Sequence, residues 1–75
     1  MLPVVKEMQA ALRNSPFEFS IRHDDVDLHT IITMWHNEYI TECAIWDLVF
    51  NSFDTEVVAA RVKSALYAAL LESNG

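Results

Sequence analysis

Apolar and polar residues alternate cleanly in one stretch near the start of the chain, PFEFSIRHDDVD (residues 16–27). The two sets that would face opposite sides of an extended segment are Phe17, Phe19 and Ile21, and Glu18, Ser20 and Arg22. This period of two predicts a short β-strand over residues 17–22. One strand cannot pair its own backbone groups, so it needs a partner. We favour the same strand of a second subunit over residues 28–34, because no hairpin turn signal separates these two segments.

Helical spacing dominates the rest of the chain. Apolar residues recur every three or four positions over residues 3–13, from about 25 through Trp35, over 38–51 and over 55–72. The β-branched run TIIT (residues 30–33) weakens the second of these helices and leaves a strand open there. Ser52 or Asp54 is the expected cap of the last helix. The sequence therefore predicts a mainly α fold of three to four short helices with one strand. The alternative is an α+β fold in which a hairpin of residues 17–22 and 28–34 packs on helices.

The helix predicted over residues 38–51 has apolar residues on nearly every side. Trp46 and Phe50 share one arc, and Leu48 lies opposite them, so both faces of this helix need cover. A single domain of 75 residues, of which 52% are apolar, has little interior in which to hide them. Core packing accounts for such a set, and so does a homodimer, which we predict. The expected dimer or hydrophobic interface consists of Phe17, Phe19, Ile21, Trp35, Tyr39, Trp46, Leu48 and Phe50.

Acidic residues crowd the middle of the chain, whose net charge is −6 overall. Between Glu18 and Glu56 nine acidic residues face only one basic residue, Arg22, so this segment carries a net charge of −8. Such a segment repels phosphate backbones and attracts basic protein surfaces, although a solubility charge explains it as well. The residues expected to bind a partner are Asp24, Asp25, Asp27, Glu38, Glu42 and Asp47.

The candidate chemistry of the chain is sparse. His23 and the acids of residues 24–27 are of types that bind divalent metals, and Asp25, His29 and His36 would share one face of the second helix. Acids at a helix start and surface histidines explain the same pattern. Cys43 falls on an apolar arc, which favours a buried small hydrophobe over a nucleophile. The single glycine is Gly75, so no glycine-rich phosphate loop is present. We therefore predict no enzyme activity, no cofactor and no metal site.

The single cysteine and the lack of a long apolar run bear on the compartment. A small secreted domain would usually carry paired cysteines, and a bilayer span needs about 18 apolar residues. The first residues, MLPVVKEMQAALRN, carry Lys6, Glu7 and Arg13 and show no signal-peptide cleavage pattern. The sequence predicts a cytoplasmic protein with no membrane contact.

A strand followed by two helices resembles the ribbon-helix-helix repressors. FEFSIRHDD would be the strand and helix start, ITECAIWDLVFNSF the second helix, and residues 17–53 would be covered. The resemblance implies a dimer whose paired strands enter the DNA major groove, with Glu18, Ser20 and Arg22 facing the bases. The acidic charge opposes such contacts and disfavours direct nucleic-acid binding.

Our leading hypothesis is therefore a small acidic regulator or inhibitor that binds another protein with a basic surface. It would occlude a nucleic-acid-binding surface by placing carboxylates where phosphates would sit. The alternatives are a ribbon-helix-helix-like DNA-binding dimer and a structural homo-oligomer without a separate ligand.

Overall fold

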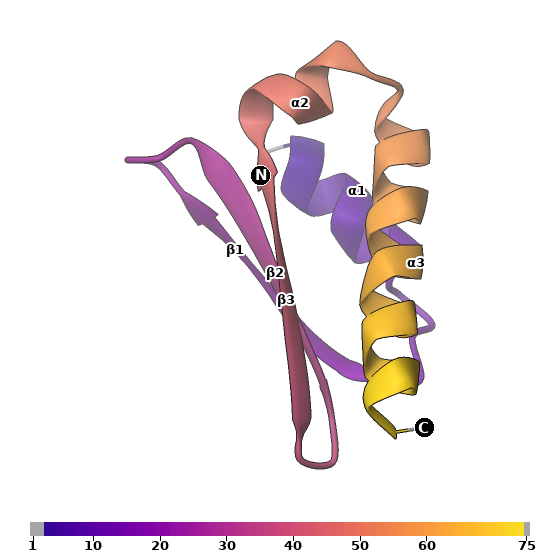
Figure 1. The fold of residues 1–75 in the computed structure, drawn as a ribbon. Helices are drawn as coiled ribbons and strands as arrows, with labels where there is room; N and C mark the ends of the chain where they lie inside the picture. Colours follow the sequence, from indigo (N-terminus) through magenta and orange to yellow (C-terminus); the bar gives the residue numbers. More distant parts are fainter. Residues whose placement is uncertain (1–2, 75) are drawn as a thin grey trace.

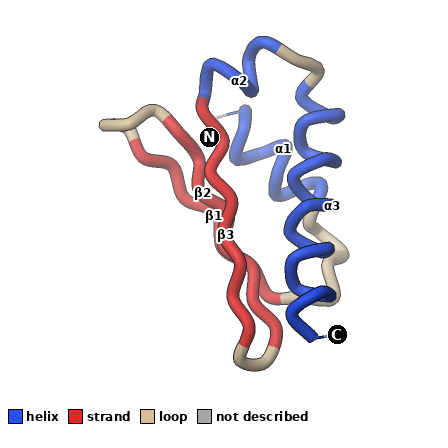
Figure 2. The backbone as a smooth tube through the Cα atoms, in the orientation of Figure 1, coloured by secondary structure: helices blue, strands red, loops and turns tan. Residues whose placement is uncertain are grey.

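The structure, a computed structural model, describes residues 3–74, with side chains described through residue 72. Its elements in chain order are α1 (Pro3–Ala11), β1 (Glu18–Asp24), β2 (His29–His36), β3 (Tyr39–Trp46), α2 (Asp47–Ser52) and α3 (Thr55–Asn74). The strands form one antiparallel sheet in the order β1-β2-β3. All three helices lie on the same side of this sheet, as Figures 1 and 2 show. The fold is thus α+β, and the prediction of a mainly α fold with one strand is wrong.

The strand register decides which side chains face the helices. Ile32 at the centre of β2 lies opposite Ile21 of β1 and Cys43 of β3, and the Ile32 side chain is fully buried. Because side chains alternate along a strand, the neighbouring row faces the other way. That row includes Ile31 and Ala44, and it forms the sheet face that no helix covers. We call it the open face.

The core lies between the sheet and the helices. Each element except β1 contributes to its buried cluster: Val4, Met8, Leu12, Ile32, Met34, Ile45, Phe50, Ala59, Leu66 and Leu70. Met8 follows Val4 by four positions, and Leu70 follows Leu66 by four, so each pair lies on one helix face. Phe17, Phe19 and Ile21 pack against this cluster from the side of β1. The fold is therefore a two-layer sandwich of one sheet and one helical layer.

The second helix that was expected from about residue 25 does not form. Residues 25–28 make a turn, and β2 follows and pairs with β1 along its length. The strand predicted over residues 17–22 thus pairs with β2 of its own chain, so the hairpin alternative lies closer to the structure, and pairing with a second subunit stays a prediction. Leu28 closes the turn at a positive φ of 54°, a conformation that glycine adopts more readily. Position 28 thus lacks the glycine or asparagine by which a tight hairpin turn is recognised, although aspartates precede it.

The third helix predicted over residues 38–51 forms only in its last part. Residues 39–46 are instead β3, and only α2 remains helical. A two-residue turn at Asn37 and Glu38 joins β2 to β3, and Asn37 supplies the positive φ (57°) that tight hairpin turns require. Trp46 and Ile40 lie on the open face rather than in the core, so the segment carries apolar residues on both faces. This removes the simple alternation by which a strand is recognised.

The first and last helices were predicted correctly. The prediction of residues 3–13 agrees with α1 to within two residues, and that of 55–72 agrees with α3. Asp54 is the cap: its Oδ1 accepts hydrogen bonds from the backbone N–H groups of Glu56 (3.0 Å) and Val57 (3.4 Å). Ser52 does not cap α3, because its hydroxyl donates to the carbonyl of Leu48. Among the described residues, none of the helices combines the length and apolar character that crossing a membrane requires.

Candidate functional site

Four of the acidic residues predicted to bind a partner gather at one end of the sheet. Asp24 ends β1, Asp25 and Asp27 lie in the turn that follows, and Asp47 begins α2. The turn and α2 are adjacent because the backbone N–H of Asp47 donates to the carbonyl of Leu28 at 2.9 Å. We call the set Asp24, Asp25, Asp27 and Asp47 the acidic end.

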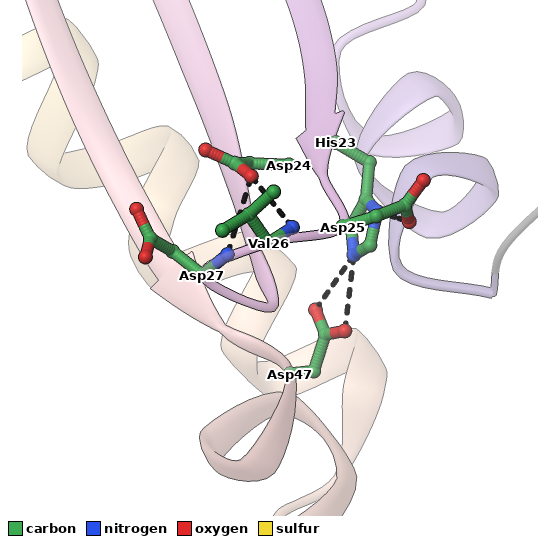
Figure 3. A network of polar contacts seen from close by, with 6 residues as sticks. All are labelled: His23, Asp24, Asp25, Val26, Asp27 and Asp47. Carbon is green, nitrogen blue, oxygen red and sulfur yellow. Dashed lines mark hydrogen bonds and ion pairs between the residues drawn. The ribbon is translucent and has the colours of Figure 1, made fainter.

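His23 lies between two of these carboxylates (Figure 3). Its Nδ1 is 2.9 Å from Oδ1 of Asp25, and its Nε2 is 3.0 and 3.2 Å from the two carboxylate oxygens of Asp47. Ionised carboxylates only accept hydrogen bonds, so both contacts are satisfied when both ring nitrogens carry protons. The hydrogen bond and charge of Asp47, aided by Asp25, raise the pKa of His23 above its ordinary value. The site thus favours an imidazolium ion that ties the turn to α2.

Asp24 has a different task within the acidic end. Its Oδ1 accepts hydrogen bonds from the backbone N–H groups of Val26 (2.8 Å) and Asp27 (3.2 Å), as Figure 3 shows. The N–H groups of Asp27 and Val26 stabilise the charged carboxylate and lower the pKa of Asp24. Asp24 therefore shapes the turn from which Asp25 and Asp27 project, both exposed to solvent.

A second grouping overlaps the acidic end. One ligand atom each of Asp24, Asp27 and His29 lies within 4.8 Å of the other two, and Nδ1 of His29 is buried without a hydrogen-bond partner among the described residues. Two carboxylates and an imidazole are ligands that divalent transition metals accept, so these are the residues that could hold such an ion. The set proposed on one helix face does not exist, since His29 and His36 stand at opposite ends of β2.

The other two predicted partner-binding acids lie elsewhere. Glu38 is in the turn between β2 and β3, at the opposite end of these strands. Glu42 lies on the open face, where it accepts a hydrogen bond from the Thr33 hydroxyl (3.1 Å) and lies 3.8 Å from Arg22. The structure therefore brings together four of the six residues and separates Glu38 and Glu42 from them.

The residues predicted as a dimer or hydrophobic interface divide into buried and exposed groups. Phe50 is 1% exposed and belongs to the core, against which Phe17, Phe19 and Ile21 also pack. Trp35 lies half-buried on the open face, and its indole N–H donates to the carboxylate of Glu18. The members with exposed side chains are Tyr39, Trp46 and Leu48. These three are the most exposed members of the set.

An apolar groove runs beside β3 and was not predicted. It encloses about 560 Å³ and is lined by Cys43, Ala44, Ile45, Trp46, Val49, Phe53, Val57, Val58, Arg61 and Val62. We call it the edge groove. Its residues come from β3, α2 and α3 and from the connection between the two helices, so only the packing of α3 along β3 creates it. Burial raises the pKa of the Cys43 thiol, which favours the protonated form over the thiolate that nucleophilic catalysis uses.

Comparison with protein-family models, with curated proteins and with solved structures finds no match for this chain. The acidic end and the edge groove are therefore the two candidate functional surfaces of the described residues.

Proposed function

We propose that this protein is a small, non-enzymatic regulator or inhibitor that binds a basic protein surface through its acidic end. One observation carries the proposal: four carboxylates gather there, and among the described residues the basic side chains beside them are two histidines, His23 in ion pairs and His29 near Asp24. Among the described residues no Lys or Arg side chain forms an ion pair with these four carboxylates, so their net negative charge remains available to basic side chains of a partner.

Exposed apolar side chains in the same turn support protein binding over a mere solubility charge. Val26 is 89% exposed and Leu28 is 57% exposed, and both project from the loop that carries Asp25 and Asp27. Apolar contacts surrounded by charged groups are characteristic of protein–protein interfaces. A basic surface of the kind that binds nucleic acid would match this pattern, because the carboxylates can occupy the positions of phosphates. The single cysteine is consistent with action in the cytoplasm.

The fold removes the basis of the ribbon-helix-helix alternative. In that family, two copies of the strand pair with one another, whereas β1 pairs with β2 of its own chain. Residues 29–36 and 39–46 are strands where the resemblance required the first helix and the start of the second. Glu18, Ser20 and Arg22 consequently lie on the open face of a three-stranded sheet and not on a two-stranded ribbon.

A charge-matched pair of variants tests the proposal. The probe is a fluorescent peptide of alternating Lys and Arg residues, and its binding is followed by anisotropy at rising salt. Asp25→Asn/Asp27→Asn should weaken binding by about 2- to 10-fold, as expected for two exposed ion pairs. The control Glu38→Gln/Glu72→Gln removes the same charge from other parts of the surface and should have a smaller effect. Binding of the wild type should fall as the Debye length shrinks from about 10 to about 3 Å.

Three outcomes would contradict this function. Equal losses in the two double variants would mean that only net charge matters. Binding that does not respond to salt would assign the contact to apolar surface instead. A gel shift of mixed duplex DNA at low salt would support direct nucleic-acid binding.

A further inference from the structure

Along the outer edge of β3, backbone groups have no partner among the described residues. The hydrogen bond from the N–H of Asp47 to the carbonyl of Leu28 identifies a hydrogen-bonded position of the β2–β3 ladder. Such positions alternate along antiparallel strands, so the backbone groups of Cys43 point toward β2. Those of Glu42 and Ala44 point away from β2, and β3 is the last strand of the sheet. Both residues are exposed.

Apolar side chains surround this edge. Among them are Ile40 (73% exposed), Trp46 (58%), Phe53 (65%), Val57 (49%) and Val49 (42%), and four of these five line the edge groove. The full surface of an aromatic side chain is about 200 Å², and that of an aliphatic one is somewhat less. With the exposed fractions given above, these five side chains together expose on the order of 500 Å² per molecule. Two such surfaces reach the roughly 1,000 Å² that a specific protein interface needs. Among the described residues that line the groove, Arg61 alone is charged, so the groove suits an apolar occupant.

We propose that a second copy of this chain occupies the β3 edge, with the two β3 strands pairing antiparallel across a two-fold axis to form a continuous six-stranded sheet. A second copy is the occupant that the observations favour, because the same exposed edge supplies both halves of the interface. A two-fold pairing is self-complementary by construction. The pairing satisfies the free backbone groups of β3 and covers the apolar side chains beside it.

Charge selects the register of this pairing. A two-fold axis at Glu42 would set two carboxylates directly opposite each other, which destabilises a sheet. An axis at Cys43 sets Glu42 opposite Ala44 of the second copy and Ile40 opposite Trp46 of the second copy. Ile40 and Trp46 are both large apolar side chains, and both lie on the open face. Of these two axes, charge therefore favours the one at Cys43, and we take the pairing as centred there.

This register places the two Cys43 residues at a position without backbone hydrogen bonds between them. Opposed Cα atoms at such positions are about 4.5 Å apart, and disulfides form at Cα separations of about 4.4–6.8 Å. Mild oxidation with diamide, which accepts the two electrons and two protons released by two thiols, should therefore give a covalent dimer that dithiothreitol reverses. In a Cys43→Ser background, Ala44→Cys should cross-link far less, because its copy lies diagonally across the axis.

Opposite substitutions at one residue test the register without oxidation. Ala44→Glu sets a new carboxylate opposite Glu42 of the second copy, twice by symmetry, and should raise the dissociation constant about 5- to 10-fold. Ala44→Lys sets an opposite charge there and should lower the dissociation constant by a similar factor. Light scattering and sedimentation at protein concentrations of roughly 1–200 µM would give these dissociation constants, because dimers of weak to moderate affinity dissociate in this range. Circular dichroism checks that both variants keep the fold.

Three results would overturn the dimer or its register. A wild type that stays monomeric at the highest concentration excludes the second copy and leaves the groove to another protein. Equal effects of Ala44→Glu and Ala44→Lys, or efficient cross-linking at residue 44, would exclude the Cys43-centred pairing. The test is independent of the acidic end, since Asp25→Asn/Asp27→Asn should dimerise as the wild type does.

Discussion

His23 is the side chain through which pH acts most directly on the fold. Its ring contacts Asp47 of α2 and Asp25 of the β1–β2 turn, and it is only 11% exposed. These carboxylates raise the pKa of His23 in the folded state. The folded protein therefore binds a proton at His23 more tightly than the unfolded chain does. The resulting stability is fully present below the unfolded pKa of 6.5, and it is lost as pH rises through the higher folded-state pKa.

We predict that His23→Gln lowers the melting temperature more at about pH 5.5 than at about pH 8.5, because only the charged ring gains from both carboxylates. Asp47→Asn should reduce the same pH dependence, since Asp47 is the main cause of the shift. His36→Gln is the control, because the contacts of His36 are the Phe17 ring and the Asn37 amide. Thermal unfolding followed by circular dichroism measures all four proteins. A His23→Gln deficit that grows toward high pH would contradict the assignment of an imidazolium.

At the scale of elements, the hairpins depend on two residues that hold positive φ without being glycine. Asn tolerates this region because its short side chain bonds locally, whereas Leu carries the full steric penalty. Asn37 (φ 57°) and Leu28 (φ 54°) occupy the two turns that define the sheet. The chain has no glycine other than Gly75, so it accepts strain at Leu28 where many hairpins would use glycine.

Substitutions in the two turns should therefore change the free energy of unfolding in opposite directions. Asn37→Ala should lower the free energy of unfolding by about 1 kcal/mol, whereas Asn37→Gly should leave it nearly unchanged. Leu28→Gly should raise it by up to about 1 kcal/mol, because the relief of the steric penalty exceeds the added freedom of the unfolded chain. Val26→Gly, in the same turn but without a positive φ, should lower stability. Urea titrations compare the four variants; a destabilised Leu28→Gly would show that the side chain of Leu28 contributes more than its backbone conformation costs.

The same turns explain why the sequence predicted the outer elements better than the middle. α1 and α3 each carry a buried face that recurs with helical spacing, and Asp54 gives α3 a recognisable start. β2 and β3 carry apolar residues on the core side and on the open face, so the period of two is hidden. Ile31 and Ile32 are adjacent in β2; Ile32 is buried and Ile31 is partly buried on the opposite face. Apolar residues on successive positions fit a buried helix as readily as such a strand.

At the scale of the whole molecule, the candidate surfaces were predictable only where they are local in sequence. Asp24, Asp25 and Asp27 adjoin one another in the chain, and the sequence identified them as a group. Asp47 joins them through the contact of α2 with the β1–β2 turn, which no pattern within either segment reveals. The edge groove combines β3 with α3, and the sequence could not predict it while residues 39–46 were expected to be helical.

Two aromatic residues expected at one interface now have separate roles that mutation can distinguish. Phe50 is 1% exposed, so Phe50→Ala should lower the free energy of unfolding by about 3–5 kcal/mol at any protein concentration. That loss is a large part of the total stability of a small domain. Trp46 is 58% exposed, so Trp46→Ala should cost less than about 1 kcal/mol in dilute protein. Its effect should grow with concentration, because association stabilises the folded state by mass action. Urea unfolding at several concentrations separates the two behaviours. A Trp46→Ala variant as unstable as Phe50→Ala in dilute solution would show that the tryptophan belongs to the monomer core and that the β3 edge is already covered within one chain.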